Sequence, residues 1–201
     1  FLFRGFSRKK TLDIIVSGLF FGLGFYAYTS YRMVILLLPL IFLCWPFYQG
    51  KKKQFLLSIF YLLITVIVVA LPIGIYFLQN PQDFISRAAP ISIFNQEQPI
   101  QAFFISLVKH LAMFNIYGDP NWRHNFAGQP ILLWPVGIFF VLGFLRSWIK
   151  LFKTRKSHGH FSAPHLMLLS WFFVGMLPTV LSNEGLPHAL RTLIVAPVVF
   201  I

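Results

Sequence analysis

The chain has 201 residues and a formal net charge of +12, yet only 11% of its residues are charged and 57% are hydrophobic. Soluble domains carry about 25% charged residues, so the polar side chains here are too few to cover a soluble globule. The basic residues lie beside apolar runs, which indicates membrane topology rather than nucleic-acid binding. The composition therefore predicts an all-α integral membrane protein without nucleic acid as a partner.

The apolar runs predict a single transmembrane domain over residues 1–201, a multi-pass helical bundle. We expect five complete membrane helices, the start of a sixth, and an outer-face loop that contains an interfacial amphipathic helix. Because the sequence opens on Phe1 and stops within an apolar run at Ile201, we expect a fragment of a longer protein. The single cysteine, Cys44, excludes an intrachain disulfide.

The first two predicted helices cover residues 12–29 and 33–49. An aromatic turn that ends at Arg32 separates them, and two helices fit the run better than one because about 20 residues span a bilayer. Gly18 and Gly22 lie four residues apart on one face of the first helix. This spacing permits close helix approach, although glycine is also simply common in membrane helices.

The third predicted helix covers 55–78, with Pro72 near its far end as a kink. The polar segment 79–130 follows it. Within this segment, apolar residues recur at helical spacing over 99–116, but Lys109 and His110 interrupt them too early for a membrane span. We expect an amphipathic helix at the membrane interface; packing against other helices is the alternative.

The remaining runs predict helices over 131–149 and 165–181 and the start of another over 192–201. If successive helices alternate in direction, the segments 1–11, 50–54 and 146–164 share one side and hold 12 of the 17 Lys and Arg residues. The positive-inside rule places them in the cytoplasm. The loops 79–130 and 182–191 then face outward.

The sequence contains no strong soluble-enzyme motif. The sequence has no phosphate-binding glycine loop, no C-x-x-C and no H-E-x-x-H, and Ser182 with His188 shows no further sign of nucleophilic catalysis. Four residues have the side chains that bind divalent metals, but their spacing matches no familiar zinc pattern: Asp119, His124, Glu184 and His188. They could equally hydrogen-bond one another, so we assign no metal ligand and leave a divalent metal open.

The stronger signal in the outward segments is cationic. A guanidinium can bind two phosphate oxygens at once, and a phosphate held at the membrane by an apolar tail would belong to a lipid-linked substrate. Alternatively, interfacial arginines pair only with the phosphates of membrane lipid. The cationic residues are Arg32, Arg87, Arg123 and Arg191, together with His124 and His188.

Four stretches carry a resemblance to a known family: Gly22–Arg32, Gly118–Asn125, Gly128–Pro130 and Pro187–Thr192. Their order and context resemble the bacterial C-type (GT-C) glycosyltransferases, more narrowly the protein O-mannosyltransferase and lipid A aminoarabinose transferase group. The resemblance implies a polyprenyl-phosphate-linked sugar as donor and a protein, lipid or glycan as acceptor. It also implies a location in a bacterial-type plasma membrane, with transfer on the outer face.

The resemblance implies roles for several residues. Arg32, His188 and Arg191 would bind the donor phosphate, and further outer-loop candidates are Arg87, Asp119, Arg123, His124 and Glu184. The family's catalytic carboxylate lies in its first outer loop, which we expect before Phe1. That carboxylate would deprotonate the acceptor, while Arg and His donors offset charge on the departing phosphate in an inverting transfer.

Alternatives from other classes remain at this point. A transporter or flippase would need ionisable residues and broken helices at mid-membrane, whereas the charges here lie at helix ends and in loops. An O-antigen ligase or polymerase would use a similar donor. A non-catalytic scaffold would not need its cationic residues to meet. The transferase predicts that Arg32, Arg123, His188 and Arg191 converge on one side.

Overall fold

The computed structural model describes residues 1–42, 52–86, 88–158 and 162–201. In these ranges the chain is all-helical, as predicted. Beyond its helices it has a single isolated β-bridge, which joins Ser92 to Ser182. The α-helices are α1 (Leu2–Arg8), α2 (Thr11–Leu23), α3 (Lys52–Gln79), α4 (Pro81–Ile85), α5 (Pro99–Ala112), α6 (Trp134–His158), α7 (Ala163–Val180) and α8 (Ala196–Val199). The 3₁₀-helices are η1 (Gly24–Tyr26), η2 (Thr29–Leu37), η4 (Ile93–Asn95) and η5 (Leu190–Val195).

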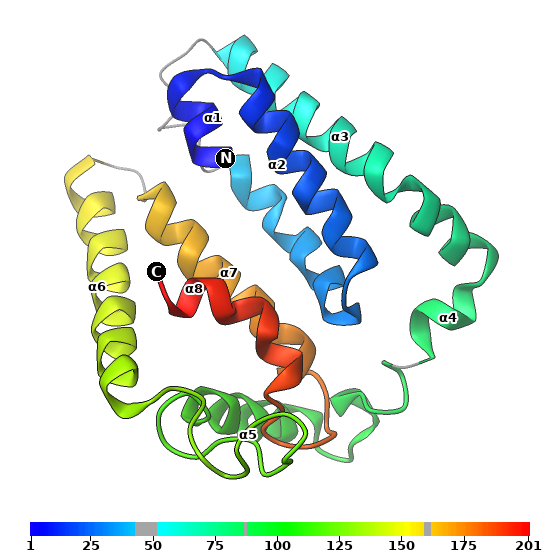
Figure 1. Cartoon of the computed structure of the whole chain (residues 1–201), viewed down its shortest axis with the longest axis vertical. Coiled ribbons are helices and arrows are strands. Elements are labelled where there is room, and N and C mark those ends of the chain that lie inside the picture. The colour runs from blue at the N-terminus through cyan, green and yellow to red at the C-terminus, as the bar shows by residue number, and fades with distance from the viewer. Residues whose placement is uncertain (43–51, 87, 159–161) are drawn as a thin grey trace.

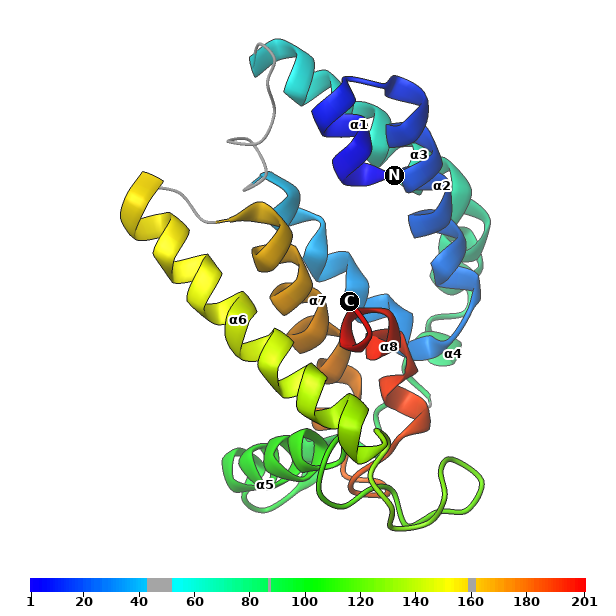
Figure 2. The same ribbon diagram turned by 60° about the vertical axis from the view of Figure 1, so that its left-hand side comes forward.

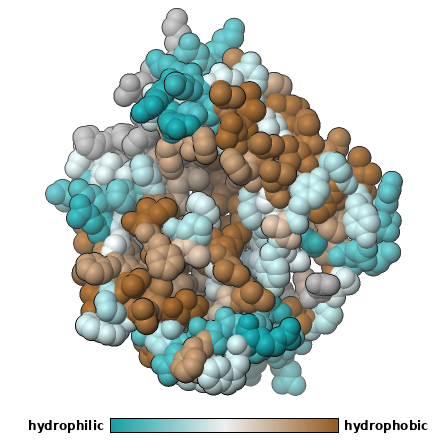
Figure 3. All heavy atoms as spheres, viewed as in Figure 1, coloured by the Kyte–Doolittle hydropathy of each residue, from teal (hydrophilic) through white to brown (hydrophobic). Residues whose placement is uncertain are grey.

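Within the described ranges, three helices are long and apolar enough to cross a membrane: α3, α6 and α7. The shortest, α7, has 18 residues and is about 27 Å long at 1.5 Å per residue, close to the ~30 Å hydrocarbon core of a bilayer. Many large apolar side chains on α3 and α6 are exposed, and broad hydrophobic areas cover these helices in Figure 3. Exposed apolar surface of this extent indicates a membrane protein.

The first predicted helix is shorter than expected, and the second has a different form where the structure describes it. The run over 12–29 forms α2 followed by η1, and the described part of 33–49 is 3₁₀-helical, with Cys44 outside the described residues. The turn between them depends on Gly24, because a Cβ there would lie 2.0 Å from the Tyr31 ring. The Tyr31 hydroxyl donates to the Phe21 carbonyl at 3.1 Å. The ring thus folds back onto the end of α2.

Other helix ends differ from their predicted positions for local reasons. α6 starts at Trp134 rather than near 131, because the N–H groups of Ile131 and Leu132 donate to the carbonyls of Met113 and Phe114. It extends to His158, past the predicted end at 149, because lysine and arginine are good helix formers. α5 ends at Ala112, not 116.

The helices place the basic and polar segments at opposite ends of the molecule. Figures 1 and 2 show α1, the start of α3 and the end of α6 at one end, which we call the basic end. α5 and the loops 113–133 and 181–189 lie at the other, the polar end. α7 runs between the two ends.

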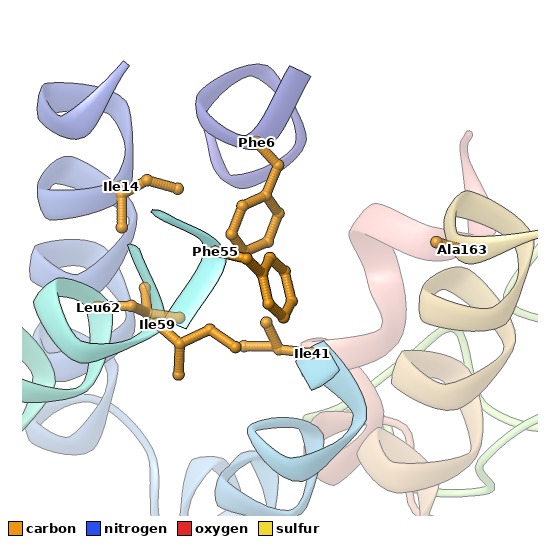
Figure 4. Packing of buried hydrophobic residues seen from close by; sticks show 7 residues of the cluster. All are labelled: Phe6, Ile14, Ile41, Phe55, Ile59, Leu62 and Ala163. Atoms are coloured by element: carbon orange, nitrogen blue, oxygen red, sulfur yellow. The ribbon is translucent and has the colours of Figure 1, made fainter. Parts of the chain in front are cut away.

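Two hydrophobic clusters hold the helices together. In Figure 4, Phe6 of α1, Ile14 of α2, and Phe55, Ile59 and Leu62 of α3 meet near the basic end, with Ile41 and Ala163. The second cluster centres on α7 and lies toward the polar end. Its buried members are Phe114, Leu132, Phe172, Met176, Val180, Val195 and Val199. The loop after α5 is thereby fixed to α7.

α2 and α3 pack closely through the two glycines singled out by their spacing. A Cβ on Gly18 would lie 2.8 Å from Thr65 Cβ, and one on Gly22 would lie 2.7 Å from Val69 Cβ. Real Cβ atoms do not approach so closely. The spacing therefore reflects helix packing rather than only the general frequency of glycine in membrane helices.

We expect Gly22→Val to destabilise the protein by about 1–3 kcal/mol, because the added methyl groups overlap α3. The thermal unfolding midpoint of the purified protein in detergent measures this loss. Gly143→Val in α6 is the matched control, since a Cβ there meets nothing within 4 Å. Equal midpoints for the two variants would contradict the close α2–α3 contact.

Candidate functional site

Three segments that are distant in sequence meet at the polar end. The Ile93 N–H donates to the Leu181 carbonyl at 3.0 Å, and the Asn183 N–H donates to the Ile91 carbonyl at 2.7 Å. These bonds join the segment before α5 to the loop after α7. The loop after α5 then packs beside both, as Figures 1 and 2 show.

The loop after α5 closes on itself at its base. The Gly118 N–H donates to the Gly128 carbonyl at 3.2 Å, and the Gly128 N–H donates to the Asp119 carbonyl at 2.9 Å. A Cβ on Gly118 would lie 1.8 Å from the Gln129 carbonyl oxygen, so the two chain segments can approach only because this residue is glycine. The closure holds Asp119 at the base of the loop.

The Asp119 carboxylate links the two loops. Its side chain is buried, with the residue 2% exposed. Its Oδ1 accepts from the Asn121 N–H at 2.8 Å. Its Oδ2 lies 2.8 Å from the Ala189 N–H donor and 2.8 Å from His124 Nδ1. Burial acts to raise the pKa of this carboxyl, but the N–H donors and His124 outweigh it and lower the pKa below its usual value. The group is therefore ionised at neutral pH.

Two histidines lie beside this carboxylate. The rings of His124 and His188 stack with centroids 4.3 Å apart and planes at 19°. His188 is only 9% exposed, and its Nδ1 is the single buried side-chain N or O atom without a hydrogen-bond partner in the described ranges. Burial, aided by the Arg191 charge, lowers the pKa of His188 to about 4. Its ring is therefore neutral at pH 7 and keeps a lone pair.

His110, on α5, hydrogen-bonds to the backbone of His188 and to α7. The ring is fully buried, and its Nδ1 lies 2.8 Å from the Ser106 carbonyl, to which it donates. Its Nε2 must then accept, and it does so from the Thr179 hydroxyl at 2.6 Å and from the His188 N–H at 3.0 Å. His110 therefore joins α5, α7 and the loop after α7. In the sequence it only interrupts an apolar helix, so this role could not be predicted.

Arg191 lies next to the histidines with its guanidinium already bound. Nη2 donates to the Glu184 carboxylate, and Nη1 donates to the Ser182 hydroxyl. The Arg191 side chain is 14% exposed, whereas that of Glu184 is 61% exposed. The ion pair thus has its acidic partner on the accessible side, where a competing anion would enter.

Neither Arg123 nor Arg32 takes part in this ion pair. Arg123 is exposed, and only its backbone N–H, donating to Asn121 Oδ1 at 3.0 Å, has a hydrogen-bond partner among the described residues. The Arg32 guanidinium lies 4.5 Å from the Phe77 ring centroid and 4.4 Å from that of Phe84. It also donates to the Phe84 carbonyl at 2.6 Å. Arg32 thus ties η2 to α3 and α4, and Arg87 lies outside the described residues.

The structure therefore brings together part of the predicted site. One carboxylate oxygen of Asp119 and one nitrogen each of His124 and His188 all lie within 4.8 Å of one another. Glu184 and Arg191 form the adjacent ion pair, so Glu184 does not join this group. A cavity of about 170 Å³ adjoins the site, and its lining includes His124, Asn125, Phe114, Leu132, Leu190 and Leu193. The site thus combines an ionised carboxylate, a neutral imidazole and a guanidinium, and His124 connects it to the cavity.

Comparison of the chain with models of protein families, with curated proteins and with solved structures gives no match.

We expect His110→Ala to lower the thermal unfolding midpoint more than Thr179→Val does. The alanine leaves two buried donors, the Thr179 hydroxyl and the His188 N–H, without an acceptor, and each such loss costs about 1–3 kcal/mol. The valine removes one donor, while His110 Nε2 keeps the other. A larger loss in Thr179→Val would contradict the acceptor role of His110.

Stability should also fall as the pH drops below about 6.5, the usual pKa of a histidine in an unfolded chain. Burial lowers the pKa of His110 and His188 in the folded protein, so the unfolded chain takes up protons first. Each histidine can contribute a slope of up to about 1.4 kcal/mol per pH unit. Unfolding measured from pH 7.5 to 4.5 in metal-free buffer checks this, and His188→Ala should reduce the slope. A wild-type stability that stays constant over this range would contradict the prediction.

Proposed function

We propose that the chain belongs to a membrane glycosyltransferase whose donor is a polyprenyl-phosphate-linked sugar. The chain binds the phosphate of this donor, and the sugar is transferred to a protein, lipid or glycan. The observation that carries this proposal is the position of Arg191 beside His188 and His124, at the polar end of a bundle with candidate membrane helices. A phosphate attached to a membrane-embedded tail would reach such a position. The resemblance of four sequence stretches to C-type glycosyltransferases supports the same function.

In this proposal the bundle crosses the membrane with five complete helices and the start of a sixth, with the polar end facing outward. The common location of α1, the start of α3 and the end of α6 at the basic end supports this orientation, because basic segments favour the cytoplasmic side. Trp122 and Phe126, exposed on the loop after α5 with ring centroids 4.9 Å apart, suit a membrane interface.

Arg191 would bind the phosphate by exchanging the Glu184 carboxylate for phosphate oxygens. The exchange is possible because carboxylate and phosphate oxygens can both accept hydrogen bonds from the same guanidinium N–H groups. Arg123 carries an exposed positive charge on the neighbouring loop. The adjoining cavity, lined by Phe114, Leu132 and Leu193, would accept the first apolar units of the lipid. As the bond between sugar and phosphate breaks, the guanidinium offsets the charge on the departing phosphate.

The positions of the charges in α3 and α7 favour a transferase over a transporter. The only charged residues of α3 are Lys52 and Lys53 at its start, and α7 has no Asp, Glu, Lys or Arg. Ion-coupled transport usually needs ionisable groups within the spanning helices. The carboxylate that activates the acceptor is not assigned within residues 1–201.

The test is release of polyprenyl phosphate from a labelled polyprenyl-phosphate sugar by the full-length protein in liposomes. We expect Arg191→Ala to reduce turnover by about 10²–10³-fold, the usual cost of losing a donor that stabilises developing charge. Arg4→Ala is the matched control, because Arg4 also pairs with a carboxylate, that of Asp13, but at the basic end. It should leave turnover unchanged.

Equal turnover by Arg191→Ala and wild type would show that Arg191 does not bind the donor phosphate and that its ion pair with Glu184 is structural. Absence of turnover by the wild type on polyprenyl-linked donors would overturn the proposal and favour a transporter or a scaffold.

A further inference from the structure

We infer that Asp119, His124 and His188 form a binding site for a divalent transition-metal ion of the Zn²⁺ class. The site joins the loop after α5 to the loop after α7. The inference concerns metal binding itself and does not depend on the proposed transferase activity.

The geometry needs only a small adjustment to accept an ion. The candidate ligand atoms already lie within 4.8 Å of one another. Around a tetrahedral Zn²⁺ with bonds of about 2.0–2.1 Å, ligand atoms are about 3.3 Å apart, so contraction by roughly 1.5 Å at most is needed. Asp119 Oδ2 and His124 Nδ1 are already 2.8 Å apart. Rotation of the stacked rings would supply the rest, and the ion would replace the hydrogen bond.

A second observation indicates that an ion binds beside His188. His188 is more than nine-tenths buried, and its Nδ1 has no hydrogen-bond partner among the described residues. A buried polar atom without a partner is unfavourable, and nearly all such atoms in folded proteins are bonded. Coordination of an ion by the His188 ring would give this imidazole a function for its lone pair.

The surrounding hydrogen bonds resemble those that orient metal ligands. The Asn121 and Ala189 N–H groups hold the Asp119 carboxylate, and the His188 backbone is bonded to His110. Such outer partners fix the direction of ligand atoms and strengthen metal binding. Two of the three ligands are thus positioned before an ion arrives.

The ligand types select the class of ion. Two imidazoles and one carboxylate suit Zn²⁺, Co²⁺ or Fe²⁺, whereas Mg²⁺ and Ca²⁺ prefer oxygen ligands. Glu184 is bound to Arg191 and does not complete the set. Three protein ligands leave a fourth position for water or another ligand, and the neighbouring cavity already includes His124 in its lining.

The test uses the full-length protein in detergent, purified with a histidine-free tag and stripped of metal by a chelator. Calorimetric titration with Zn²⁺ should give one ion per chain. We expect His124→Ala and Asp119→Asn each to weaken Zn²⁺ binding by at least 100-fold. The matched control is His165→Ala, because His165 lies at the start of α7 and is bonded to Ser162, away from the site.

Absence of saturable Zn²⁺ binding by the wild type at 100-fold molar excess over protein would overturn the inference, as would equal affinities in His124→Ala and His165→Ala. A further readout does not need variants that fold. X-ray absorption of the Co²⁺-loaded wild type should show two imidazoles per ion. A shell of oxygen ligands alone would contradict the proposed site.

Discussion

The polar end depends on the buried carboxylate of Asp119. Its two oxygens accept hydrogen bonds from its own loop and from the Ala189 N–H of a loop that is 70 residues further along the chain. A buried carboxylate is costly unless donors surround it, so the two loops are stable together rather than separately. His110 also joins two segments, because its single acceptor nitrogen accepts from one donor on α7 and from one in the loop after α7.

These polar contacts rest on apolar packing around α7. Phe172, Met176 and Val180 fix Phe114 and Leu132, which flank the loop that carries Asp119. The hydrogen bonds of Ile131 and Leu132 to Met113 and Phe114 then set where α6 begins. The site is thus built on packed helices, although every proposed ligand lies in a loop.

The sequence predicted the helical class and the approximate bounds of α3, α5, α6 and α7, because long apolar runs and helical spacing decide these features locally. It also identified Gly18 and Gly22 and, at the polar end, Asp119, His124, His188, Glu184 and Arg191. It could not predict that Tyr31 folds back over Gly24 or that His110 accepts two buried donors. Arg32, whose guanidinium contacts Phe77 and Phe84, was grouped with the site because of its charge and the family resemblance. Such details depend on contacts between segments that no local pattern encodes.

The exposed partner of Arg191 has a consequence for selectivity. Glu184 precedes Arg191 by only 7 residues, so its carboxylate would compete with an incoming anion at a high effective concentration near the guanidinium. A small free anion in solution must compete with this carboxylate and gains little by replacing it. An anion that also inserts an apolar group into the neighbouring cavity gains additional free energy from burial. The ion pair would therefore act as a filter that admits amphiphilic anions and rejects simple ones.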